Sequence, residues 1–337
     1  MRTYFLFIFL GLIALTALGQ IPGPIVWPTP NNAFMRGEDI SKFIQPTVSG
    51  RVSSGLYGCV RNDGNRFHEA VDLFPIFRKP NGEPDEPVYA VMRGVVVYAN
   101  EVASRSSYGR YVVVEHPEAD VPVYTLYSHL ASVADNVSPG TRVEAGSVLG
   151  QLGRSASYDI PKERAHLHFE IGLRISDDFN TWYSEQDYRD PNYFGLWNGM
   201  NLSGMDPLSF YLSIRGGSFE SFEKHITAQA VGSKIRIFTN KVPDFSTRYP
   251  MLLRREINLD RGIVAWDVSF TQYGMPIGMT PWYRGELEPK AAGAIELIQI
   301  DEALVQKTAC WRTLVKKGSG YEVGRFLQRY LKLMFAY

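Results

Sequence analysis

Short runs of β-branched and aromatic residues, separated by turn-forming residues, dominate the chain between residues 51 and 173. Valine, isoleucine and tyrosine favour strands because their side chains pack well on a pleated surface, while glycine, asparagine and proline mark the turns. The pattern predicts a mainly β fold: an antiparallel β-sheet domain followed by a second, mainly β domain. The expected strands cover residues 88–98, 111–116, 123–130, 148–152 and 166–173 in the first domain, and 234–239 and 263–271 in the second.

The sequence HLHFEIG, which begins at residue 166, alternates strictly between polar and apolar residues. Successive side chains of a strand point to opposite faces, so His166, His168 and Glu170 share one face and the apolar residues face the core. A lone histidine on a strand is more often a surface or core residue than a ligand. Two imidazoles on one face favour a metal or catalytic site, with Glu170 either a partner of that site or a solvated carboxylate.

The sequence RFHEAVD combines His68 and Asp72, which offer a nitrogen and an oxygen ligand of the kind that zinc accepts. The competing interpretation is a helical metalloprotease motif of the HExxH type, with Glu69 as the base. Pro75 and an upstream Asp-Gly turn oppose a helix here, and the β-branched Val71 fits a strand better. Taken alone, the pair is equally compatible with a surface histidine and aspartate that bind no metal.

Three other histidines carry less information. In the sequence VYTLYSHL, alternation places His129 on one strand face with Thr125 and Tyr127. That position is neutral evidence by itself. His116 and His225 are assigned no role.

The segments HEAVD, YSHL and HLHFEIG, in this order, resemble the signature segments of the lysostaphin/LytM-like zinc metallopeptidases. The similarity includes the flanking strands and turns, from about residue 55 to residue 173. It implies an open groove on an antiparallel sheet, and a zinc metalloendopeptidase that hydrolyses peptide cross-links or stem peptides of bacterial peptidoglycan by attack of a zinc-bound water. Two departures concern substrate preference: Ala70 stands where a glycine is usual, and the loop 156–164 is longer than usual.

The resemblance implies that His68, Asp72 and His168 bind Zn²⁺, while His129 and His166 are the catalytic histidines that flank the water. As a hypothesis, His166 accepts the proton of the water, and His129 donates a hydrogen bond to the oxyanion of the attacked carbonyl group. One alternative is a non-enzymatic cell-wall-binding or amidase-activating module on the same fold. A zinc peptidase that acts on other proteins or peptides is a second.

The remaining organisation follows from local composition. An arginine, an apolar run and a small-residue end are typical of a secretory signal peptide, and a proline-rich stretch after it cannot sustain a helix. An irregular segment, 176–212, is typical of a loop beside a binding cleft. The expected order is a signal peptide at 1–19, an extended N-terminal segment at 20–50, a zinc peptidase domain at 51–212, and a C-terminal domain of unknown role at 213–337 with a helix at 324–333.

Charge and cysteine content limit the partners. Lys+Arg and Asp+Glu both number 35, so no excess of positive charge favours nucleic acid. Export predicts a periplasmic or extracellular location in the cell envelope, with peptidoglycan peptides as partners and no stable membrane insertion after signal cleavage. Cys59 and Cys310 are either one disulfide bond, which an oxidising exterior permits, or two separate thiols. The sequence does not indicate an oligomeric state.

Overall fold

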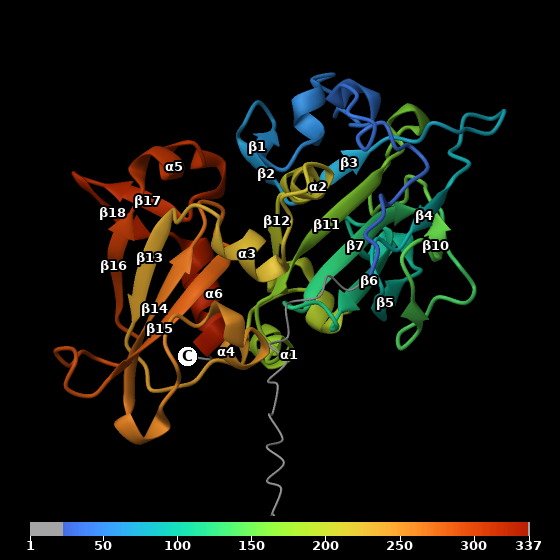
Figure 1. Cartoon of the computed structure of the whole chain (residues 1–337). Helices are drawn as coiled ribbons and strands as arrows, with labels where there is room; N and C mark the ends of the chain where they lie inside the picture. Colours follow the sequence, from blue (N-terminus) through green and yellow to red (C-terminus); the bar gives the residue numbers. More distant parts are fainter. Residues whose placement is uncertain (1–22, 336–337) are drawn as a thin grey trace, which may run out of the picture.

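The computed structural model describes residues 23–335 and contains two β-rich halves that lie side by side (Figure 1). The expected signal peptide, residues 1–19, lies outside the described residues. Within residues 23–335, every helix is too short or too polar to cross a lipid bilayer. The mainly β fold with antiparallel sheets is confirmed.

A seven-stranded antiparallel sheet forms the first half. Its central strand is β11 (Leu167–Arg174), which is buried along its whole length and pairs with three neighbours, β7, β12 and β3. The strand order is β12 (Leu202–Met205), β11, β7 (Val123–Leu130), β6 (Arg110–His116), β5 (Gly94–Asn100) and β9 (Arg142–Val143), with β3 (Val71–Leu73) paired to β11 outside this path.

The proline-rich N-terminal segment packs on this half as part of its core. Trp27 stacks on Phe34, with ring centroids 4.9 Å apart, and meets Tyr211 edge-on at 4.8 Å. Tyr211 in turn contacts Phe169 of β11. The segment therefore contributes buried aromatic surface to the sheet rather than serving only as a tether.

Smaller sheets lie beside the large one. The hairpin β1 (Gly58–Arg61) and β2 (Arg66–His68) precedes β3, and β4 (Pro87–Tyr89) pairs with β10 (Val148–Gln151), which pairs with β8 (Ser132–Val133). The expected single strand 88–98 is wrong, because β4 and β5 belong to different sheets. Residues 90–92 between them are fully buried, so the apolar run gives no sign of the break.

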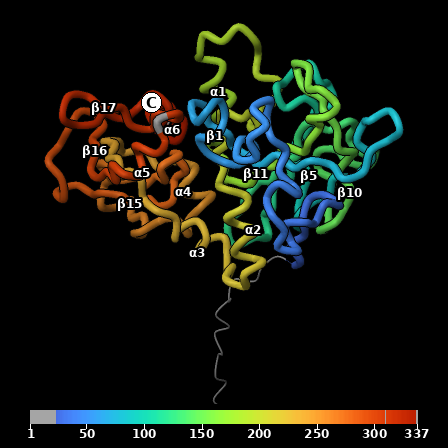
Figure 2. Tube along the Cα trace, turned by 90° about the horizontal axis from the view of Figure 1, so that it is seen from above, coloured from blue at the N-terminus to red at the C-terminus, as the bar shows by residue number. Residues whose placement is uncertain are grey.

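The second half contains a four-stranded antiparallel sheet, with α6 (Arg325–Phe335) near the expected helix 324–333. Figure 2 shows this half beside the first, with β1 close to the junction. The sheet order is β15 (Pro276–Tyr283), β14 (Ile263–Phe270), β13 (Ser233–Ile237) and β16 (Ile295–Ile300), and a hairpin of β17 (Leu314–Lys317) and β18 (Gly320–Val323) follows. The shorter helices are α3 (Phe222–Thr227), α4 (Asp244–Arg248) and α5 (Glu302–Gln306), and 3-10 turns include η4 (Lys162–Arg164) and η9 (Ala309–Trp311).

The segment 176–212 is more regular than expected. It contains α1 (Phe179–Ser184), β12 and most of α2 (Pro207–Arg215). Asp206 accepts a hydrogen bond from the Leu208 backbone N–H, and Pro207 occupies the first turn, which together start the helix. The expected domain boundary at residue 213 lies inside α2.

Covalent and aromatic contacts join the two halves. Cys59 of β1 and Cys310 of η9 form a disulfide bond, which decides between the two alternatives that the sequence left open. Phe67 of β2 stacks on Trp311, with ring centroids 4.6 Å apart. The Tyr330 hydroxyl of α6 donates to the Leu202 carbonyl oxygen at 2.6 Å. The hairpin that ends in His68 is therefore fixed against the C-terminal half.

Candidate metal centre

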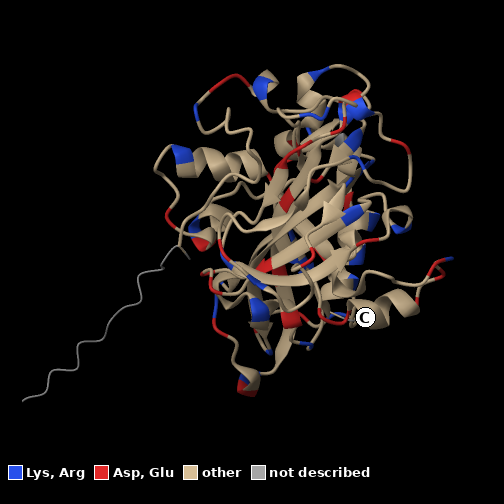
Figure 3. Cartoon of the chain, turned by 90° about the vertical axis from the view of Figure 1, so that its right-hand side faces the viewer, with Lys and Arg blue, Asp and Glu red and all other residues tan. Residues whose placement is uncertain are grey.

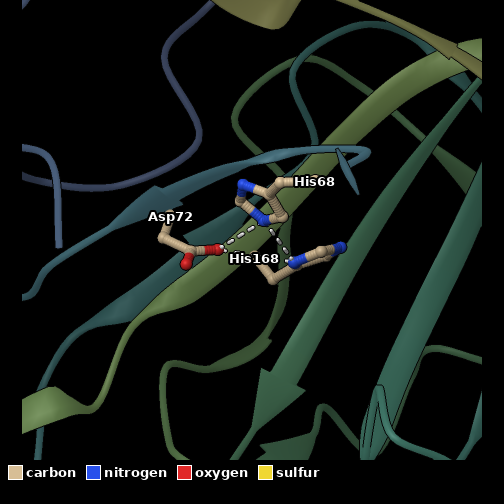
Figure 4. Close-up of side chains that lie close together, drawn as sticks. All are labelled: His68, Asp72 and His168. Atoms are coloured by element: carbon tan, nitrogen blue, oxygen red, sulfur yellow. Dashed lines mark hydrogen bonds and ion pairs between the residues drawn. The ribbon is translucent and has the colours of Figure 1, made fainter. Parts of the chain in front are cut away.

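Three strands bring His68, Asp72 and His168 together (Figure 4). His68 ends β2, and Asp72 lies directly opposite His168 in the antiparallel pair of β3 and β11. Opposite residues in such a pair share one face of the sheet, so the backbone register alone places the carboxylate beside the imidazole. Both strands are extended, which excludes the helical HExxH interpretation.

The ligand atoms of the three residues converge. His68 Nε2 lies 3.2 Å from Asp72 Oδ1, and His168 Nδ1 lies 3.4 Å from the same oxygen. The two imidazole nitrogens are 3.3 Å apart. All three side chains are buried.

Hydrogen bonds on the far side of each ring define which nitrogen faces the centre. The Nδ1–H of His68 donates to the Leu56 carbonyl oxygen at 2.7 Å, which leaves the Nε2 lone pair toward Asp72. The Nε2–H of His168 donates to Glu170 Oε1 at 3.0 Å, which turns Nδ1 toward the same carboxylate. Glu170 is 1% exposed, so it is a partner of the site and not a solvated carboxylate.

The centre requires positive charge. Asp72 Oδ1 is buried and accepts no hydrogen bond within residues 23–335. Burial alone would raise the pKa of this carboxyl, but His166, His68 and Arg61 hold the pKa well below its usual range. Burial likewise opposes charge on His168, yet the nearby carboxylates of Asp72 and Glu170 raise the pKa of that imidazole to about 10. Two imidazole nitrogens and one carboxylate oxygen that lacks a hydrogen bond fit a divalent metal ion. The metal ion would supply the positive charge in place of the proton on His168.

Arg61 also reaches the centre, a contact that sequence reasoning missed. Its guanidinium NH2 lies 2.5 Å from Asp72 Oδ2 and 2.7 Å from His68 Nε2. It comes from the first strand of the hairpin that ends at His68, and no motif in the sequence marks it. Because it uses the Nε2 lone pair of His68, the guanidinium must withdraw before a metal ion binds that nitrogen.

The two expected catalytic histidines lie beside the three ligands. The rings of His129 and His166 are 4.7 Å apart, and His166 Nε2 lies 3.5 Å from Asp72 Oδ1. Each Nδ1–H donates to a backbone carbonyl, Ser155 O for His129 and Arg164 O for His166. Burial lowers the pKa of both imidazoles, so each presents a neutral Nε2 that accepts protons.

His129 reaches the centre by a route that alternation does not predict. Tyr127 lies opposite Phe169 on the core face of the sheet, and regular alternation would send His129 to that face as well. The expected shared face is wrong, because His129 has a φ of 62° at the end of β7. This left-handed conformation turns its ring toward His168, with ring centroids 5.7 Å apart.

A cleft of about 240 Å³ opens on the centre. Tyr158, Ile160 and Arg164 from the long loop before His166 line it. Residues 66–180 match the model of peptidase family M23.

The M23 segment contains all five residues that the resemblance singled out, and the resemblance to lysostaphin/LytM-like peptidases is thereby confirmed. The match supports a hydrolase of the metallopeptidase type. No curated protein matches the chain. The C-terminal half lies outside the M23 segment.

Solved structures similar to the chain include several peptidases. A putative glycyl-glycine endopeptidase lytM from Ruminococcus gnavus is 27% identical over 31% of this chain and 38% of its own, with a TM-score of 0.25. A zinc-containing peptidase from Vibrio cholerae is 23% identical over 44% of this chain and 32% of its own, with a TM-score of 0.24. The catalytic domain of lysostaphin from Staphylococcus simulans is 23% identical over 47% of this chain and 88% of its own, with a TM-score of 0.29. The chain spans well under half the length of the first two.

Proposed function

We propose that the chain is an exported zinc metalloendopeptidase that hydrolyses peptide cross-links or stem peptides of bacterial peptidoglycan. One observation carries the proposal: Asp72 Oδ1 is buried, accepts no hydrogen bond from the described residues, and lies within 3.4 Å of nitrogens of His68 and His168. The match of this segment to a peptidase family supports the same activity. The nitrogen and oxygen ligand set favours zinc among the common metal ions.

His68, Asp72 and His168 would hold the metal, and their outer contacts fix them in place. The Leu56 carbonyl oxygen orients His68, and Glu170 orients His168. Bound zinc would supply Lewis-acid chemistry, which polarises a carbonyl group and makes water a nucleophile near neutral pH. Three protein ligands leave room for water and substrate, as catalytic rather than structural zinc sites do.

His166 is the proposed proton acceptor. Its Nδ1–H is held by the Arg164 carbonyl oxygen, and its Nε2 faces the metal centre. His129 has the same arrangement with the Ser155 carbonyl oxygen, so its neutral Nε2 accepts a proton rather than donating one. The hydrogen bond from His129 to an oxyanion therefore requires that His129 first receive a proton.

The cell envelope is the proposed location. The N-terminal residues have the composition of a secretory signal, and a disulfide bond is stable in an oxidising compartment. Peptidoglycan lies in that compartment, and the resemblance to lysostaphin/LytM-like peptidases supports it as the substrate.

Zinc content and digestion of isolated peptidoglycan test the proposal. We expect one zinc per mature chain and release of peptide fragments. His168→Ala and Asp72→Ala should lose zinc and activity, because each removes a ligand. His166→Ala should keep zinc and lose about 10²–10⁴-fold in turnover, the usual contribution of general acid–base catalysis.

His225→Ala, outside the M23 segment, is the matched control and should retain both zinc and activity. A His166→Ala enzyme that turns over at the wild-type rate would refute the role of His166. A zinc-free protein that binds peptidoglycan without cutting it would instead establish the non-enzymatic binding module.

A further inference from the structure

A cavity of about 580 Å³ lies between the M23 segment and the C-terminal half. It adjoins the cleft at the metal centre, since Arg66, Glu69 and Tyr108 line both. Glu170, which accepts the hydrogen bond from His168, is also in its wall. A peptide bound at the metal centre can therefore continue into this cavity.

The C-terminal half provides the opposite wall. Trp311 and Phe326 lie in it with ring centroids 4.3 Å apart, and the guanidinium of Arg329 lies 5.3 Å from the Phe326 ring. Aromatic faces beside a cation form a surface that accepts both the apolar and the anionic parts of a ligand. None of these three residues belongs to the M23 segment, so the family match does not account for this wall.

The arginines that line the cavity have no carboxylate partner among the described residues. Arg66, Arg105 and Arg329 line it, and across residues 23–335 none of them lies within ion-pair distance of a carboxylate. Arg329 Nε is buried without a hydrogen-bond partner among the same residues. Two carboxylates, Glu69 and Glu170, also line the cavity, but neither lies within ion-pair distance of these arginines. The two oxygens of Glu170 accept hydrogen bonds from His168 and Tyr124 instead.

We infer that this cavity is a substrate subsite for the carboxylate-bearing part of an acidic peptide, with Arg329 as the residue that pairs with a substrate carboxylate. A planar guanidinium binds a carboxylate through two parallel hydrogen bonds, which gives orientation as well as attraction. Trp311 and Phe326 flank the bound peptide. The inference rests on the proposed function, since it concerns the substrate of the same metal centre.

The disulfide bond fixes this subsite relative to the metal ligands. Cys310 lines the cavity and is bonded to Cys59 in β1, the partner strand of β2. Phe67, the residue before His68, stacks on Trp311. The aromatic wall and a metal ligand are therefore joined through one hairpin, which holds the distance between scissile bond and subsite constant.

Binding of a tetrapeptide muropeptide to the full mature chain loaded with zinc tests the inference, with its fully amidated counterpart as the second ligand. We expect Arg329→Gln to weaken binding of the carboxylate form at least tenfold by calorimetry, and to raise KM on acidic substrates with little change in kcat. Binding of the amidated form should stay at the wild-type level. Arg329→Lys should recover part of the loss, because lysine restores the positive charge but not the planar group that makes two parallel hydrogen bonds.

Arg325→Gln is the matched control, since Arg325 lies on the same helix, is exposed and does not line the cavity. An equal loss for both ligand forms, the same loss in the control, or no binding of either form by the wild type would each overturn the inference. If the wild type binds the carboxylate form through Arg329 but cuts no peptide bond, the subsite stands and the proposed function fails. If the wild type cuts peptidoglycan and Arg329→Gln changes neither binding nor KM, the proposed function stands and the subsite fails.

Discussion

His129 shows how one backbone angle determines the composition of the site. Its φ of 62° places a residue with a β-carbon in a region where L-amino acids are strained, at a cost of about 1–2 kcal/mol. This strained conformation places the His129 ring beside the rings of His166 and His168. The Tyr108 carbonyl oxygen accepts from the His129 backbone N–H at 2.9 Å and holds the turn in place.

Glycine and alanine at this position should therefore differ. Both His129→Gly and His129→Ala remove the imidazole, but only alanine keeps the β-carbon that disfavours a positive φ. We expect the glycine variant to be more stable by up to about 1 kcal/mol, although glycine elsewhere in a strand costs stability. Thermal unfolding of the two zinc-free proteins measures the difference. If His129→Ala is as stable as His129→Gly or more stable, residue 129 gives up its positive φ once the imidazole ring is removed.

Short-range patterns in the sequence pointed to the site, but the assignment of His68, Asp72 and His168 as ligands came from the family resemblance. Alternation in HLHFEIG predicts that His166 and His168 share one face, and a proline after RFHEAVD opposes the helical motif. The tautomer-fixing carbonyl groups of Leu56, Ser155 and Arg164 could not be predicted, because they depend on how distant loops close around the site. The contact of Arg61 with the site could not be predicted for the same reason.

At the scale of elements, a buried carboxylate ties an extended loop to the sheet of β4. Glu86 precedes this strand and is 1% exposed. Its Oε1 accepts from the Ile76 backbone N–H at 2.8 Å, and Oε2 has no partner among the described residues. Burial raises the pKa of the Glu86 carboxyl to about 7, although the Ile76 hydrogen bond opposes the shift.

This raised pKa makes stability depend on pH. The unfolded chain ionises Glu86 near pH 4.5 and the folded chain near pH 7, so stability is fully present below pH 4.5 and falls as pH rises to 7. The shift corresponds to about 3 kcal/mol. Glu86→Gln should lack this loss, so its Tm should exceed that of the wild type increasingly between these pH values. A constant difference across the range, or the same trend in the exposed control Glu101→Gln, would contradict the assignment.

Strands were predictable where alternation or β-branched runs are uninterrupted, as in β7 and β11. The break between β4 and β5 was not, because residues on both sides are buried and the apolar pattern continues through it. The start of α2 had a local signal, an aspartate followed by proline, but its aromatic-rich surroundings resembled a loop. Pairing between distant elements, such as β12 with β11, depends on the whole sheet.

At the scale of the molecule, the C-terminal half forms one wall of the cavity that adjoins the cleft at the metal centre. The disulfide bond, the Phe67–Trp311 stack and the hydrogen bond from Tyr330 to Leu202 all cross the same junction. Acidic and basic residues are interspersed along the chain, as the ribbon in Figure 3 shows. Polar contacts also join the halves: the Arg248 guanidinium pairs with Asp177, and the Asp120 carboxylate accepts hydrogen bonds from the Phe222 and Glu223 backbone N–H groups.

Removing the disulfide bond should weaken the whole assembly. The double variant Cys59→Ser, Cys310→Ser removes a cross-link between residues that are 251 positions apart. The unfolded chain then gains conformational entropy, which lowers the free energy of unfolding by up to about 5 kcal/mol. We expect a lower Tm in the double variant and a matching decrease in the wild type under reductant. The double variant itself should not respond to reductant. Equal melting of wild type and variant under oxidising conditions would show that packing alone holds the halves together.

The bond between Cys59 and Cys310 also links oxidation to the docking of the two halves. The two cysteines are 251 residues apart in sequence and lie in different halves, so neither half can form the bond alone. The two sulfur atoms meet only when η9 has docked beside β1, which requires the C-terminal half to have folded. Pairing of these cysteines therefore reports that η9 has reached β1, and we expect free thiols in molecules whose C-terminal half has not yet docked.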